Sequence, residues 1–92
     1  MNDTSDAAPA LAWCVDRLVL AWRGAGNTIL NIGATQPGGL ALAGATMLRE
    51  QSHNAPALAV AGDAPVLGWT GTDQRLNVAS VDIWTGVLEH LL

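Results

Sequence analysis

Short runs of alternating large and small apolar residues fill this chain, and turn-forming residues separate the runs. In the second half, Pro56 to Ala61 and Val66 to Thr70 flank Gly62-Asp63-Ala64-Pro65, whose glycine and proline favour a turn. Two further extended segments, Arg75 to Ser80 and Ile83 to about His90, follow a second glycine-containing turn. Several short strands at this spacing predict an antiparallel all-β meander.

The first half follows the same plan. Its four predicted strands are Pro9 to Cys14, Arg17 to Arg23, Thr28 to Gly33 and Leu40 to Arg49. Each half therefore contains four short extended segments in about 45 residues. We place one unit at about residues 8–50 and the other at about 55–92, within a single domain of residues 1–92.

An internal repeat supports this division. Residues 8–24 read APALAWCVDRLVLAWRG and residues 55–71 read APALAVAGDAPVLGWTG, with a constant offset of 47 and no gap. The identical pairs are Ala8/Ala55, Pro9/Pro56, Ala10/Ala57, Leu11/Leu58, Ala12/Ala59, Asp16/Asp63, Val19/Val66, Leu20/Leu67, Trp22/Trp69 and Gly24/Gly71. After a one-residue gap, Leu30-Asn31-Ile32 matches Leu76-Asn77-Val78. In the looser tails, Leu42-Ala43-Gly44 is paired with Trp84-Thr85-Gly86.

Two helical alternatives compete with this interpretation. Leu11, Val15, Leu18 and Trp22 lie at helical spacing, which by itself favours a helix from Ala10 to Arg23. The second copy argues against that helix, because it carries a glycine and a proline in its middle. The second alternative is an amphipathic helix over residues 80–92.

A four-stranded repeat of 40–50 residues is the size of a β-propeller blade. Blades bury their faces against neighbouring blades, and repeat folds generally need at least three units. Two blades would leave apolar faces bare, so we expect a ring closed by homo-oligomerisation. Three chains would give six blades and four chains eight; we favour the trimer.

The motifs PALAV…VLGWTGTDQRLNVAS and PALAW…LVLAWRGAGNTILNIG resemble the repeats of bacterial β-propeller lectins, the tachylectin-like and fucose-binding families. In these families some members use two-blade subunits that trimerise. The resemblance covers nearly all of the chain, and it implies a multivalent, carbohydrate-binding lectin rather than an enzyme. The chain departs from the pattern where the Asp73 of one repeat has no counterpart in the WRGAGN of the other, so the resemblance implies unequal sites.

Sugar recognition needs a flat apolar surface and a few polar partners, and we expect such sites between blades. The candidate ligand-binding residues are Trp69, Asp73, Arg75 and Asn77 in the second unit, Trp22, Arg23, Asn27 and Asn31 in the first, and Trp84 or Trp13 as a stacking platform. The competing interpretation is that the repeated tryptophan packs and that the repeated Asn31 and Asn77 bond neighbouring backbone. A non-enzymatic propeller scaffold for protein–protein interaction is the alternative function.

Composition narrows the remaining classes. The net charge is −4 with four arginines and no lysine, which argues against nucleic-acid partners and gives no support to binding of anionic membranes. The lone Cys14 cannot form an intramolecular disulfide, and we expect it to be a small buried side chain. No HExxH, CxxC or GxSxG motif occurs, so no catalytic residue, metal or cofactor is predicted. The first residues lack the basic and apolar regions of a signal peptide, and the compartment stays open.

Overall fold

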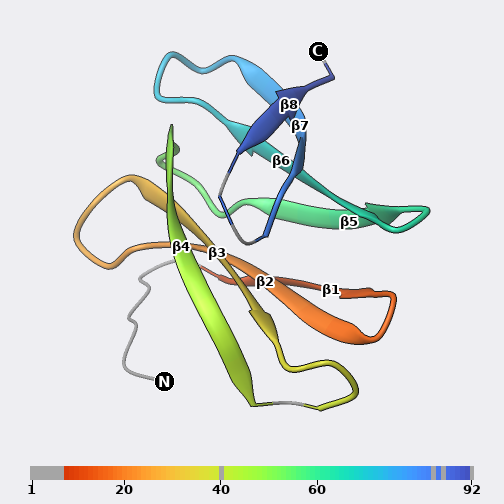
Figure 1. Cartoon of the computed structure of the whole chain (residues 1–92). Coiled ribbons are helices and arrows are strands. Elements are labelled where there is room, and N and C mark those ends of the chain that lie inside the picture. The colour runs from red at the N-terminus through yellow and green to blue at the C-terminus, as the bar shows by residue number, and fades with distance from the viewer. Residues whose placement is uncertain (1–7, 40, 84, 86, 92) are drawn as a thin grey trace.

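The computed structural model describes residues 8–39, 41–83, 85 and 87–91, and these form eight strands in two antiparallel sheets (Figure 1). The first sheet has the order β1 (Ala10–Cys14), β2 (Arg17–Arg23), β3 (Ile29–Thr35), β4 (Leu42–Gln51). The second has the order β5 (Ala57–Ala61), β6 (Ala64–Thr70), β7 (Leu76–Val81), β8 (Leu88–His90). No helix occurs in the described residues, so the all-β prediction is confirmed.

The strand register repeats as the sequence does. Leu11 pairs with Leu20 in the first sheet and Leu58 with Leu67 in the second, at the offset of 47. Across the next strand pair, Trp22 lies opposite Asn31, and Trp69 lies opposite Asn77. The one-residue gap in the alignment therefore falls in the β2–β3 and β6–β7 turns, where it leaves both ladders intact.

The predicted hairpin replaces the helical alternative over residues 10–23. Cys14 pairs with Arg17, so the β1–β2 turn consists of Val15 and Asp16 alone. Val15 has φ 59°, and Gly62 at the equivalent position has φ 66°. This left-handed conformation suits glycine and strains a β-branched residue. The turn signal is thus visible in the second copy and hidden in the first.

The structure corrects three details at the strand ends. The predicted turn over residues 62–65 is shorter, because β6 begins at Ala64 and Pro65 pairs with Val60. Thr35 pairs with Leu42 and its counterpart Val81 pairs with Leu88, so Leu88 matches Leu42 and the predicted match with residue 84 was wrong. The helix considered over residues 80–92 does not appear, since the described residues there include the end of β7 and all of β8.

The two sheets pack face to face, but the face that the first sheet buries is not the equivalent of the face that the second sheet buries. Val19, Ala21, Ile32 and Ala34 of the first sheet are buried in a cluster with Leu67, Trp69, Ala79 and Val81 of the second. Val66 is the counterpart of Val19, yet alternation along β6 puts it on the side of the second sheet away from this cluster. β1 and β5 are in contact where the sheets meet (Figure 1).

Candidate functional site

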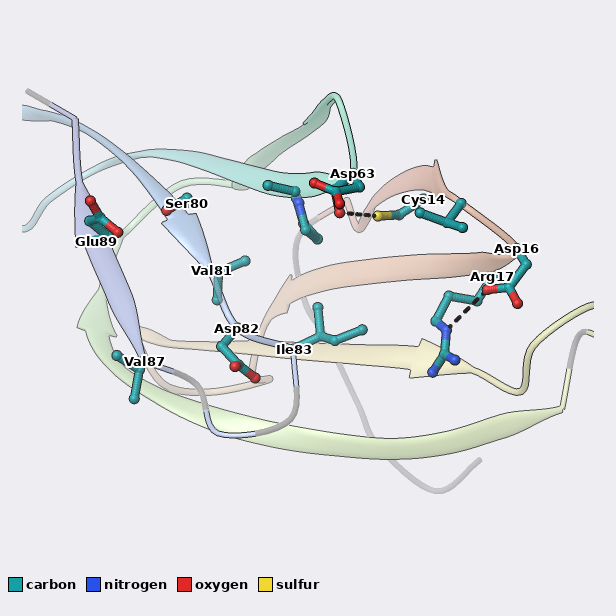
Figure 2. Close-up of a pocket in the computed structure, with 13 residues that line it drawn as sticks. Cys14, Asp16, Arg17, Asp63, Ser80, Val81, Asp82, Ile83, Val87 and Glu89 are labelled. Carbon is teal, nitrogen blue, oxygen red and sulfur yellow. Dashed lines mark hydrogen bonds and ion pairs between the residues drawn. The ribbon is translucent and has the colours of Figure 1, made fainter.

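Among the described residues, two hollows between the sheets lie at opposite ends of β6. The first, called the acidic cleft here, measures about 600 Å³ and lies at the β1–β2 and β5–β6 turns (Figure 2). The second, called the polar hollow, measures about 270 Å³ and lies at the β6–β7 turn beside the end of β4. Both are lined by residues from both sheets, so both exist only because the sheets pack together.

Three of the predicted site residues line the polar hollow. Trp69, Asp73 and Asn77 come from the second sheet and its β6–β7 turn, with Gly71 and Thr72 between them. The opposite wall is the polar end of β4, made of Arg49, Glu50 and Gln51. Carboxylate, guanidinium and amide groups thus line one space, and together they can donate and accept several hydrogen bonds.

His90 of β8 contacts one residue on each wall of the polar hollow, Glu50 and Trp69. Its Nε2 lies 3.6 Å from Glu50 Oε1, an ion pair only when the imidazole is protonated. The imidazole also meets the Trp69 ring edge to face, with centroids 5.9 Å apart and an interplanar angle of 62°. His90 and Arg49 were missed from the sequence, because nothing local indicates that β4 and β8 end beside the same tryptophan.

In the β2–β3 and β6–β7 turns, a polar side chain accepts a hydrogen bond from the backbone of its own turn. The Oδ1 of Asn27 accepts a hydrogen bond from the Ile29 N–H at 2.9 Å, and the Oδ1 of Asp73 accepts one from the Arg75 N–H at 3.1 Å. Asn27 therefore takes the structural role of Asp73 in the first repeat, and the two turns differ in charge rather than in this contact.

The repeated asparagines add a second bond to each turn. Asn31 Nδ2 donates to the Ile29 carbonyl at 3.1 Å, and Asn77 Nδ2 donates to the Arg75 carbonyl at 2.9 Å. These contacts explain why both copies have asparagine there, as the packing interpretation expected. Asn77 also lines the polar hollow.

The glycine before each turn makes room for the capping side chain. A Cβ at Gly24 would lie 2.8 Å from Asn27 Oδ1, and a Cβ at Gly71 would lie 2.7 Å from Asp73 Oδ1. Both distances are shorter than a real Cβ contact allows. The glycine of the Trp-x-Gly pattern in the two repeats therefore leaves space for the polar side chain that caps the turn.

The tryptophans differ in accessibility. Trp22 and Trp69 are only 5% and 3% exposed, so neither offers an open ring face for stacking in the single chain. Trp13 is 55% exposed and its Nε1 donates to the Val15 carbonyl at 3.1 Å. Trp84 lies outside the described residues. Among the three tryptophans that the structure describes, the ring exposed on the surface is thus that of Trp13, which lies on the first sheet and does not line the polar hollow.

The remaining candidates lie apart from the polar hollow. Arg23 donates from Nη1 to the His53 carbonyl and so ties β2 to the segment that joins the sheets. Arg75 has an 85% exposed side chain and lies 3.8 Å from the Asp73 carboxylate. Trp22, Arg23, Asn27 and Asn31 are not among the described residues that line either hollow.

The acidic cleft carries four carboxylates around an apolar floor. Asp16, Asp63, Asp82 and Glu89 line it, with Arg17 3.6 Å from Asp16 (Figure 2). The remaining lining residues include Cys14, Pro65, Val81 and Ile83. The Cys14 thiol donates to the Asp63 carbonyl at 3.2 Å. Burial first, and then the Asp63 carboxylate, raise the pKa of this thiol, which keeps it protonated and weakly nucleophilic.

Within the described ranges, no three His, Cys, Asp or Glu side chains gather closely enough to hold a metal ion. The same part of the chain has no helix with the length and apolar character of a membrane span. Comparison with protein-family models, with curated proteins and with solved structures gives no match.

Proposed function

We propose that this chain is a two-blade β-propeller lectin that binds glycans in the polar hollow and completes its ring with further copies of itself, and we favour a ring of three chains in all. Two sheets with the same strand order and register, packed face to face, support the interpretation as neighbouring blades. A ring would repeat each site, and the repetition would raise the effective affinity for a multivalent glycan.

The convergence of polar groups from two sheets on one hollow carries this proposal. Asp73 and Glu50 can each accept hydrogen bonds from two hydroxyl groups, and Arg49 can donate to ring and hydroxyl oxygens. Trp69 is 3% exposed, so it contributes an edge rather than a stacking face. The polar groups would therefore supply most of the affinity, and one site would be weak.

A glycan array with the intact chain tests the proposal, followed by calorimetric titration of each positive glycan. Glu50→Gln removes a charged acceptor from the hollow and should weaken binding about ten- to hundredfold, since such a bond contributes about 1.5–3 kcal/mol. Glu89→Gln removes the same charge from the acidic cleft and serves as the matched control, with unchanged affinity expected. Silence of the folded, assembled chain on every glycan, or equal affinity for both variants, would contradict the proposal.

The alternative is a propeller scaffold that binds another protein. Exposed large apolar side chains on both sheets favour it, because such surfaces commonly mark protein contacts. Self-association would cover the same side chains. Binding of an unrelated protein by the completed ring, together with silence on glycans, would support the scaffold instead.

A further inference from the structure

Four large exposed apolar residues lie on the two outer sheet faces. Leu11, Trp13 and Met47 are 56%, 55% and 66% exposed, and the register puts all three on the outer face of the first sheet. Leu76 is 67% exposed and lies opposite Thr70 on the outer face of the second sheet. Each sheet thus has one apolar face in the core and an apolar outer face that is mostly exposed among the described residues, although Trp22 on the outer face of the first sheet is only 5% exposed.

The interface inside the chain sets large side chains against small ones. The β1–β2 hairpin of the first sheet contributes Ala10, Val19 and Ala21 to it. The β5–β6 hairpin of the second sheet contributes Leu58 and Trp69, with Leu67. A small face against a large face packs two hairpins closely without voids.

The outer faces also consist of one with large side chains and one with small side chains, but here the large ones belong to the first sheet and the small ones to the second. The outer face of the first sheet holds Leu11, Trp13 and Leu20, the counterparts of large inner residues in the second sheet. The outer face of the second sheet holds Ala57 and Ala59, together with Val66 and Gly68, the counterparts of the small inner residues of the first sheet. No charged side chain stands on these outer hairpin faces between the strand ends, so docking them desolvates no charge.

From this complementarity we infer that the partner of each outer face is a second copy of the chain, docked head to tail. The large outer face of one copy packs on the small outer face of the next, as the second sheet already packs on the first within the chain. Pairing of like faces would instead set Trp13 against Trp13, or alanine against alanine with a void between them. This inference deepens the self-association proposed above and does not depend on sugar binding.

A head-to-tail contact uses a different surface on each partner, so it continues until the rotation closes a ring. Blocking one surface should therefore stop growth without removing the other surface. Leu11→Glu places a charge on the large face, and Ala59→Glu places the same charge on the small face; both residues are exposed, so the fold of each chain should survive. Val15→Glu is the control, since Val15 is 70% exposed but lies in a turn outside both faces.

The test measures mass in solution by light scattering and native mass spectrometry, with circular dichroism to confirm the fold. The wild type and Val15→Glu should assemble, while Leu11→Glu and Ala59→Glu alone should each give the 9.5 kDa chain. An equal mixture of those two variants should give a dimer of one of each and nothing larger. Met47→Glu on the large face repeats the test if Leu11→Glu does not fold.

Two results would overturn the head-to-tail assignment, and with it the proposed ring, but would spare the proposed glycan binding in the polar hollow. One is full assembly by both single variants, and the other is a homodimer of either variant that the mixture leaves unchanged, which would mean that like faces pair. A wild-type chain that stays at 9.5 kDa would overturn the self-association as well. Glycan binding is measured separately, so its failure leaves the mass result intact.

Discussion

Replacing Val15 by glycine should make the protein more stable, which is an uncommon outcome for an apolar-to-glycine change in a strand-rich chain. Val15 adopts φ 59° as the first residue of the two-residue β1–β2 turn. Gly62 adopts φ 66° at the equivalent place in the β5–β6 turn, and an added Cβ there would meet nothing within 4 Å. The two positions therefore differ in backbone strain and in little else.

The magnitude follows from two opposing terms. The left-handed conformation costs an L-residue roughly 1–2 kcal/mol, and a β-branched side chain lies at the upper end of this range. Glycine offsets about 0.5–1 kcal/mol of the relieved strain, because it gives the unfolded chain more conformational freedom, which folding must remove. The Val15 side chain is 70% exposed, so its removal loses little buried surface. The net effect of Val15→Gly is a gain of about 1 kcal/mol, or about 4–8 °C in Tm for a domain of this size.

Urea denaturation followed by tryptophan fluorescence, at one fixed protein concentration, measures the change. Fixed concentration matters because self-association adds to apparent stability. The reverse substitution Gly62→Val should lower the free energy of unfolding by a similar amount, and the double variant should return near the wild-type value. A destabilised Val15→Gly, or an unaffected Gly62→Val, would mean that the two hairpins do not turn in the same way.

Three further predictions concern the turns, the thiol and the tryptophans. Gly24→Ala and Gly71→Ala should each lower the free energy of unfolding by about 1 kcal/mol, because the Cβ would displace the capping side chain; urea denaturation checks this, and a neutral result at either site would refute it. Cys14 should react with a thiol reagent in urea and barely in the folded chain, and rapid labelling of the native chain at neutral pH would contradict this. Because the pKa of the thiol is raised in the fold, the free energy of unfolding should fall as the pH rises above 9.0, the ordinary pKa of the thiol. Trp69→Ala should cost about 3–5 kcal/mol in stability, whereas Trp13→Ala should cost under about 1 kcal/mol and mainly weaken assembly; equal losses in a denaturation series would count against the core described here.

The internal repeat made the strand plan predictable. Gly62 and Pro65 excluded a helix in the second copy, and the shared register of Trp22 and Trp69 shows that the first copy folds the same way. Local pattern alone would have failed at Val15, because its spacing with Leu11 and Leu18 is helical and its turn lacks glycine. Duplication supplied the long-range information that a single unit lacks.

The candidate site was predictable only in part. Asp73 and Asn77 could be found from the sequence because the second turn gathers polar residues beside a tryptophan. Arg49 and His90 could not, since the contact between the ends of β4 and β8 depends on how the two sheets pack. The choice of inner and outer face was likewise hidden, because alternating Leu and Ala make both faces of each sheet apolar.

That same ambiguity between the two faces of each sheet is the basis of the assembly proposed above. Trp22 and Trp69 hold equivalent positions, each opposite an asparagine, yet in one chain only Trp69 belongs to the cluster between the sheets. When two sheets with one large and one small apolar face stack large face on small face, one face of each kind is left unpaired. In the head-to-tail arrangement both tryptophans would lie between sheets, and every sheet in the ring would have the same surroundings. In the proposed ring the repeat would need one kind of interface rather than two, and the outer faces of a single chain would form the two halves of that interface.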